Sequence, residues 1–270
     1  MSDTPFVQFE GVSPYEDYVH ADVLGSLQQP LTDAPDEMGF LITTQVMELW
    51  FTLTVHEWRA AAECFSKDDA ERALDALERS IRAHRALNDS WHPIAALTPG
   101  RFNSFRAAFG RASGSQSATY RHMEFLLGDK SREVTDCYRN HPAAHEALTE
   151  ALGRPSLYDE VLRFLRRQGL PVPRAVCERD VTEPYRADPG VEEVWRRLYA
   201  GPPHDPLLAL AERLTDLAEL VQRWRTDHVV VVRRAMGGKT GSAGSSGVAW
   251  LEDRAARPVF PELWTARGLV

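Results

Sequence analysis

Cysteine is scarce in this chain. The three cysteines, Cys64, Cys137 and Cys177, are widely spaced and odd in number. Such a set suits reduced thiols better than a disulfide framework, which favours a cytoplasmic protein. Met1–Pro5 also lacks the charged and apolar regions of a signal peptide. We therefore expect a cytoplasmic location.

Long apolar runs and basic clusters are lacking as well. No uninterrupted apolar stretch approaches the roughly 18 residues of a membrane span, so we expect no membrane-spanning helix. The net charge is -8, and Lys and Arg form no strong cluster. A nucleic-acid partner is therefore not expected, because phosphate binding needs a basic face. With 270 residues, 43% of them hydrophobic, the chain can bury a sizeable core.

Several catalytic motifs are missing. There is no Gly-x-Ser-x-Gly, no His-Glu-x-x-His and no Cys-x-x-Cys, so the usual sequence patterns of hydrolases and zinc proteases are absent. The Gly-Lys-Thr at 238–240 does not complete a phosphate-binding loop, because Arg233 stands where that loop needs its first glycine. The expected element before it is also a helix rather than a strand. We therefore do not expect nucleotide binding.

A metal cluster is possible at one place. Cys137, His141 and His145 stand four residues apart, a spacing that would align them on a single helix. Pro142 indicates that a helix begins after His141, which breaks this alignment. Solvated histidines are the favoured interpretation here.

The apolar periodicity predicts an all-α protein, a helical bundle with no strands. The chain has no internal repeat, and the stretch 170–205, with seven prolines, is expected to be irregular apart from a helix at 190–199. Its part 170–190 is either a domain boundary or a crossing connection, and we interpret it as a connection within one all-helical unit. Elsewhere the pattern predicts helices at 36–64, 68–89, 99–109, 117–127, 142–152, 156–168 and 205–236.

His228 lies on the apolar seam of the last of these helices. Steps of three and four residues place it on one face with Leu217, Val221, Trp224 and Val231. An imidazole directed into a core needs a partner, because an unpaired buried polar group costs about 1–3 kcal/mol. That partner is either a backbone carbonyl or a metal, and the seam alone favours the carbonyl.

The glycine- and serine-rich segment 237–247 follows this helix. It is either a mobile connection or a lid whose amides and hydroxyls close over a small ligand.

Arg106 has aromatic neighbours. Phe102, Phe105 and Phe109 stand at spacings of three and four residues around it. The arginine either extends its charged group from a core helix into solvent or waits in an aromatic pocket for a carboxylate. Together with the seam histidine and the hydroxyl-rich segment, it fits a protein with a histidine-held buried cofactor and a small aromatic carboxylate substrate.

At these residues the sequence resembles the tryptophan 2,3-dioxygenase superfamily of haem proteins. Four blocks carry the resemblance, and they span nearly the whole chain in the right order: Tyr15-Glu16-Asp17-Tyr18 through Asp36-Glu37-Met38 to Glu48-Leu49-Trp50; Phe105-Arg106 through Ser113-Gly114-Ser115-Gln116-Ser117 to Glu124-Phe125-Leu126-Leu127-Gly128; His228 through Gly237 and Lys239 to Gly244-Ser245-Ser246-Gly247; and Phe260-Pro261-Glu262-Leu263-Trp264.

The resemblance implies a single all-helical oxygenase domain over residues 1–270, with haem b between core helices and dioxygen as co-substrate. It implies a homotetramer in which the segment 1–35 contacts a neighbouring subunit. The resemblance implies that His228 is the proximal ligand of the haem iron and that Ser113 lies on the distal side of the haem. It implies that Arg106 binds the substrate carboxylate, that Ser242 contacts the substrate's ammonium or carboxylate, and that the indole pocket is formed by Phe40, Phe102 and Phe109. It also implies that Tyr15 and Tyr18 reach into a neighbouring subunit's site.

The chain departs from the family pattern at the substrate side. Thr44 replaces the histidine that normally accepts the indole N–H, and its hydroxyl can accept that hydrogen bond but is no base near neutral pH. Ser115 replaces a phenylalanine, Ser242 a threonine, and Phe109 a small aliphatic residue.

These departures lead us to expect oxygenation of L-tryptophan or a close derivative such as β-methyltryptophan, giving a 2-oxindole by monooxygenation with an external reductant. One alternative is an ordinary tryptophan 2,3-dioxygenase that makes N-formylkynurenine. The other is a non-catalytic haem or indole sensor.

Overall fold

The computed structural model describes residues 8–270 of the chain. Over these residues there is no strand, and the expected all-α bundle is confirmed. Its α-helices are α1 Pro14–Val19, α2 Ala21–Ser26, α3 Glu37–Ser66, α4 Ala70–Asp89, α5 Pro99–Arg106, α6 Ala118–Leu126, α7 Arg132–Asp136, α8 Pro142–Gly153, α9 Leu157–Arg167, α10 Arg174–Cys177, α11 Pro189–Tyr199, α12 Pro206–Met236, α13 Val248–Ala255 and α14 Pro261–Thr265.

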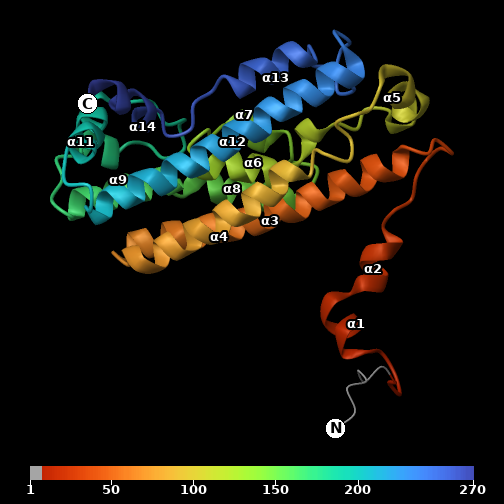
Figure 1. Ribbon diagram of the computed structural model, residues 1–270, viewed down its shortest axis with the longest axis horizontal. Coiled ribbons are helices and arrows are strands. Elements are labelled where there is room, and N and C mark those ends of the chain that lie inside the picture. Colours follow the sequence, from red (N-terminus) through yellow and green to blue (C-terminus); the bar gives the residue numbers. More distant parts are fainter. Residues whose placement is uncertain (1–7) are drawn as a thin grey trace.

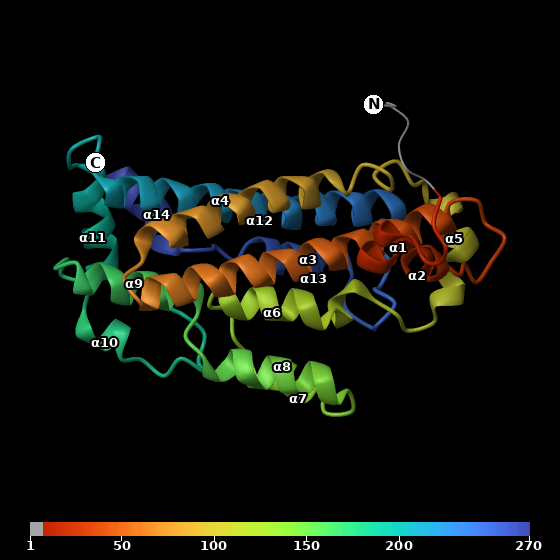
Figure 2. The same ribbon diagram turned by 90° about the horizontal axis from the view of Figure 1, so that it is seen from below.

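Three long helices form the frame of the bundle. Helix α3 packs along α4, and α4 packs along α12, so the three run together along the long axis (Figures 1 and 2). Helices α6 and α9 pack on α3, α13 packs on α12, and α8 covers α6. The core contains the expected seam of α12, with Leu210, Leu214 and Leu217 at 2% exposure or less.

Local chemistry sets the ends of these helices. Asp205 begins α12 because its carboxylate accepts a hydrogen bond from the Leu207 amide at 2.8 Å, and Pro206 follows in the first turn. Gly237 ends the helix with φ of 60°, a left-handed conformation that side chains resist. Pro142 begins α8 as expected, with His141 outside the helix.

Shorter elements differ from the expectation. The helix predicted for 99–109 ends at Arg106 and tightens into a 3-10 turn at Ala107–Phe109. The stretch 170–205 holds the expected helix α11, but also the single turn α10. Helices this short have little periodicity to read, and the same is true of those we did not expect, α1, α2, α7, α13 and α14.

A buried carboxylate joins the C-terminal block to the bundle. Glu262, only 1% exposed, accepts hydrogen bonds from the hydroxyl of Tyr185 at 2.6 Å, the hydroxyl of Tyr158 at 3.0 Å and the amide of Asp188 at 2.9 Å. The indole N–H of Trp195 donates to the Tyr158 hydroxyl at 2.9 Å. This network ties α14 to α9, α11 and the proline-rich stretch. The block Phe260-Pro261-Glu262-Leu263-Trp264 therefore stabilises the packing of the C-terminal helices on the bundle.

Helix α3 does not fit the expectation that no helix could cross a membrane. It is long and apolar enough by length and composition alone, and only 22% of its most apolar stretch is buried in this chain. A core helix of a globular protein passes the same test, and α3 contributes fully buried side chains such as Trp58 and Phe65. Its other face carries the exposed apolar residues Ile42, Leu49 and Leu53.

One buried histidine makes the stability of this core depend on pH. His84 is 1% exposed, its ring stacks on Trp58 at 5.9 Å, and its Nδ1 has no hydrogen-bond partner. Burial, aided by the nearby charge of Arg225, lowers the pKa of His84 to about 3. Between that value and the ordinary pKa of about 6.5, the unfolded chain binds a proton that the folded chain does not.

We therefore expect the stabilisation from neutral His84 to be complete above about pH 6.5 and to be lost as the pH falls toward 3. From pH 7 to pH 5 the loss amounts to about 2 kcal/mol, and His84→Leu should remove it. Urea unfolding of both proteins at the two pH values measures the difference, with His204→Leu in an exposed turn as control. An equal pH dependence of wild type and His84→Leu would contradict the assignment.

Candidate functional site

His228 lies between two tryptophans. Its ring stacks on Trp91 with centroids 4.9 Å apart and an interplanar angle of 25°, and it meets Trp224 at 5.5 Å. Trp91 comes from the turn after α4, whereas Trp224 stands one helical turn before His228 on α12. These aromatic neighbours fix the plane of the imidazole, as a metal ligand requires.

The imidazole of His228 is neutral and has no competing bond. Burial lowers its pKa to about 4, because an apolar surrounding disfavours the charged ring. It makes no hydrogen bond to any of residues 8–270, so the backbone carbonyl that the seam favoured is not its partner. A neutral imidazole with a free lone pair is the donor that haem iron takes.

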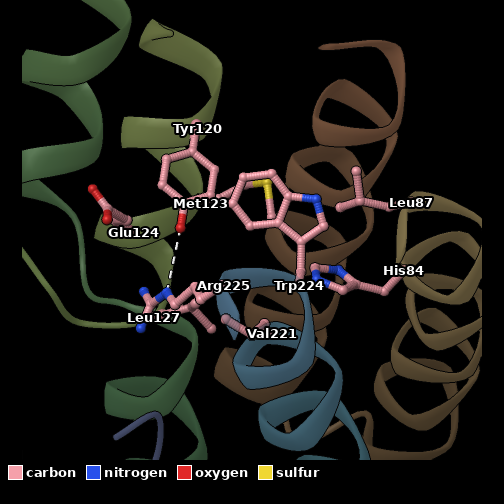
Figure 3. A pocket seen from close by; sticks show the side chains of 9 residues that line it. All are labelled: His84, Leu87, Tyr120, Met123, Glu124, Leu127, Val221, Trp224 and Arg225. Atoms are coloured by element: carbon pink, nitrogen blue, oxygen red, sulfur yellow. Dashed lines mark hydrogen bonds between the residues drawn. The ribbon is translucent and has the colours of Figure 1, made fainter. Parts of the chain in front are cut away.

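A small cavity lies beside Trp224. Figure 3 shows the side chains that line it, among them Tyr120 and Arg225. Arg225 is 5% exposed, with Nε 3.3 Å from the Tyr120 hydroxyl and Nη1 3.1 Å from the Arg257 carbonyl. The cavity measures about 10 Å³, room for one water molecule at most. It is therefore not a substrate site.

Four phenylalanines from α3, α5 and the 3-10 turn after α5 form one cluster. Phe40 stacks on Phe109 at 5.1 Å and 16°, and it contacts Phe102 at 5.8 Å and Phe105 at 5.7 Å. The expected pocket residues Phe40, Phe102 and Phe109 are therefore brought together. Phe105, which the spacing also places in this aromatic wall, is fully buried and contacts all three rings.

Arg106 lines a pocket of about 240 Å³ together with Asn103, Ala107, Gly110 and Ser242. Its Nη2 donates to the Thr240 carbonyl at 2.6 Å, and no carboxylate of residues 8–270 pairs with it. The guanidinium is half-buried, so its remaining N–H groups are available to an anion. The structure thus brings Arg106 and Ser242 to one pocket.

The glycine- and serine-rich segment is folded over this pocket. Lys239 Nζ donates to Asn103 Oδ1 at 3.2 Å, and Ser242 Oγ donates to the Ala112 carbonyl at 2.5 Å. Gly247 is required at its position because a Cβ would lie 2.3 Å from the Lys239 carbonyl oxygen and φ is 67°. Together with the bond from Arg106 to Thr240, these are three exposed hydrogen bonds on a segment of small residues, which is what a closing lid needs.

Thr44 and Ser113 present hydroxyls. Thr44 Oγ1 donates to the Phe40 carbonyl at 2.9 Å, so its own proton is used and its lone pairs remain open to solvent. Ser113 lies before the 3-10 turn Gly114–Gln116, with its Oγ 3.0 Å from that of Ser115.

Tyr15 and Tyr18 lie apart from the pocket. They stand on α1, in the N-terminal segment that extends away from the bundle (Figure 1), and their exposed fractions are 67% and 87%. Within one chain the structure does not bring them to the other site residues.

Sequence reasoning missed several residues of this region. The sequence places Trp224 on the seam four residues before His228, and the structure adds its contact with the imidazole. No pattern indicates that Trp91, Asn103 or Lys239 would lie here, since their contacts join distant segments. Among residues 8–270 no group of three or more His, Cys, Asp or Glu side chains could hold a metal ion, so Cys137, His141 and His145 form no such cluster.

Known proteins resemble the chain over nearly its whole length. The sequence profile of the tryptophan 2,3-dioxygenase family matches residues 2–208 and 197–270. The chain belongs to the tryptophan 2,3-dioxygenase family. Among its relatives, a tryptophan 2,3-dioxygenase of Bradyrhizobium diazoefficiens is 38% identical over 95% of this chain and 92% of its own length. One from Bacillus thuringiensis is 39% identical over 94% and 91%, and one from Shewanella woodyi 37% identical over 99% and 94%.

Family membership confirms the resemblance found in the sequence. It also confirms the expected enzyme class, a haem-dependent oxygenase of the tryptophan type.

The lid contacts lead to a prediction about protease access. Lys239 is the only Lys or Arg within 237–247, so trypsin cleavage after it reports how often the segment opens. Removing the amide in Asn103→Ala costs one exposed hydrogen bond, about 0.5–1.5 kcal/mol, and should speed cleavage at Lys239 several-fold. Timed digestion with mass spectrometry measures this. Ser104→Ala, on the same helix, is the control. Equal cleavage rates in wild type, Asn103→Ala and Ser104→Ala would show that the bond from Lys239 to Asn103 does not hold the segment closed.

Proposed function

We propose that this protein oxygenates the indole ring of L-tryptophan or a close derivative, with haem b held by His228 and dioxygen as co-substrate. The observation that supports the ligand assignment is the neutral, otherwise unbonded imidazole between Trp91 and Trp224. Bound haem supplies a ferrous iron that takes dioxygen, and the residues around it supply substrate position and a dry surrounding.

Arg106 would bind the substrate carboxylate. In the chain as it stands, the Thr240 carbonyl occupies one of its N–H groups at 2.6 Å. A carboxylate is a better acceptor than a carbonyl and can take two parallel hydrogen bonds from a guanidinium. Substrate binding would then rearrange the segment 237–247, and Ser242 in that segment would contact the ammonium or carboxylate.

The phenylalanine cluster would receive the indole. The stacked pair of Phe40 and Phe109, with Phe102 beside it, offers an apolar surface that excludes water from the ring. Thr44 stands one turn after Phe40 on α3, and its open lone pairs would accept the indole N–H.

The identity of residue 44 favours a specialised product. A threonine accepts a hydrogen bond but takes no proton near neutral pH, so it holds the indole nitrogen without acting as a base. We infer that oxygen is delivered to C2 only. One oxygen atom of dioxygen enters a 2-oxindole, and two electrons and two protons from an external reductant convert the other to water.

Side-chain size favours a substituted substrate. Thr44 and Ser242 are smaller than the residues usual in the family and would leave room for a β-methyl group. One methyl contributes about 1–3 kcal/mol of discrimination in a fitted pocket. Phe109 acts in the opposite direction, because it fills space beside Phe40.

An assembly would complete the site and cover the apolar faces. We propose a homotetramer in which the segment up to residue 35 lies on a neighbouring subunit, with Tyr15 and Tyr18 at that subunit's pocket. Residues 1–7 of this segment lie outside the described residues. The support is the exposed apolar surface of Val23, Leu24 and Leu27 on this segment and of Ile42, Leu49 and Leu53 on α3.

A cytoplasmic location remains part of the proposal. It is supported by the three cysteines, all free, with Cys64 and Cys177 half-buried and Cys137 exposed.

Product mass tests the proposed reaction. L-Tryptophan and β-methyltryptophan are supplied to the haem-loaded protein with ¹⁸O-labelled dioxygen and a reductant. We expect one labelled atom in the product, faster turnover of the methylated substrate, and no product without reductant. Thr44→His, which restores an imidazole, should shift the product toward two labelled atoms.

Two outcomes would overturn this proposal. Quantitative gain of two labelled atoms on L-tryptophan by the wild type would show an ordinary tryptophan 2,3-dioxygenase. Binding of indole substrates by the haem-loaded protein without any turnover would show a sensor.

A further inference from the structure

Two segments without acidic residues meet at the Arg106 pocket. Residues 90–123 and 228–251 contain no Asp and no Glu, although the chain has 39 of these acidic residues and a net charge of -8. The bonds from Arg106 to Thr240 and from Ser242 to Ala112 join the two segments beside the pocket. The pocket is therefore a place of positive charge on a molecule that is negative as a whole.

Three cations at this pocket have no carboxylate partner. Arg106 lines it, and Arg111 directly follows Gly110, another lining residue. Lys239 Nζ donates to Oδ1 of Asn103, which lines the pocket as well. The side chains of Arg111 and Lys239 are exposed, and neither forms an ion pair with any of residues 8–270. The described chain thus leaves all three charges uncompensated.

Other arginines of the same segments show the contrast. Arg101 is paired with Asp36 at the beginning of α3, and Arg233 is paired with Glu252 on α13. Where an acid comes within reach, it takes up an arginine's charge, and no acid of residues 8–270 does so at the pocket.

One bound carboxylate does not balance these charges. A carboxylate on Arg106 takes up one positive charge and leaves those of Arg111 and Lys239. An α-ammonium group beside that carboxylate would be repelled by these cations, and none of the residues that line the pocket is acidic. A ligand whose amino group is absent or acylated has a net negative charge and avoids the repulsion.

We propose that Arg111 and Lys239 make the Arg106 pocket selective for indole carboxylates of net negative charge, whose α-amino group is absent or acylated. The two cations act through water, so they attract an anion without a direct contact, and salt weakens their effect. This inference rests on the proposed function, because it takes the Arg106 pocket as the site of the substrate carboxylate.

Two probe ligands separate charge from shape. Indole-3-propionate and L-tryptophan share the indole ring and the carboxylate, but the first is an anion and the second has no net charge. Equilibrium dialysis against the haem-loaded protein measures both dissociation constants at about 20 mM and about 500 mM salt, where screening is weak and strong. Haem has carboxylates of its own, and loading every sample keeps their contribution the same.

Charge-removing variants test the two cations. Arg111→Gln and Lys239→Gln each remove one charge, and a glutamine at 239 can still donate to Asn103. At low salt each should weaken indole-3-propionate binding about twofold, the effect of a unit charge about 10 Å away in water, and the double variant about fourfold. L-Tryptophan binding should stay unchanged, and high salt should remove most of the difference. Arg111→Lys and Lys239→Arg keep the charge and should restore wild-type binding.

Arg186→Gln is the matched control. This exposed arginine forms no ion pair with any of residues 8–270, and it precedes α11, which lies at the opposite end of the bundle from α5 (Figures 1 and 2). Its loss should change neither dissociation constant.

Four results would overturn the inference. Equal weakening of both ligands in Arg111→Gln and Lys239→Gln would show a structural effect, and unchanged binding of indole-3-propionate would show that the charges do not act. L-Tryptophan bound while indole-3-propionate fails to bind would overturn this inference alone. Binding of neither ligand would overturn the proposed function together with it.

Discussion

The proposed site depends on one constraint, an imidazole kept neutral and unbonded against two tryptophan rings. His228 stands on the seam of α12, and Trp91 and Trp224 close around its ring at 4.9 and 5.5 Å. The same burial that packs the ring lowers its pKa to about 4, so the lone pair stays available at any physiological pH. Helix α4 ends two residues before Trp91, and α12 continues into the segment 237–247, which contributes Ser242 to the Arg106 pocket.

The pocket of Arg106 is built on a different physical principle. There the contacts are polar, exposed and few, such as those of Arg106 with Thr240 and of Lys239 with Asn103. Each is worth little alone, and each can be exchanged for a contact with substrate. In the proposed function, the well-packed surroundings of His228 would hold the haem, and the exchangeable contacts of Arg106 and Lys239 would meet the substrate.

Much of the fold follows from local sequence rules. Pro142 and Gly237 set helix ends where the sequence predicts them, and the three-and-four spacing of α12 predicts the buried seam of Leu217, Val221 and Val231. His228 lies half-buried on the same face. The short helices α1, α2, α7, α10, α13 and α14 were not predictable, because four to eight residues carry too little periodicity. The site was only partly predictable. The spacing around Arg106 indicated an aromatic wall, but the stacking of Phe40 on Phe109 joins α3 to the turn after α5, and only the packed chain brings them together.

The most direct test of this account is haem binding by His228→Gly, measured by the Soret absorption of the purified protein with and without added imidazole. The account predicts that the variant lacks the band because iron has lost its protein ligand, and that imidazole, which fits the space between Trp91 and Trp224, restores it. A variant that keeps a full and unchanged band without imidazole would contradict the assignment of His228 and, with it, the site built around that residue.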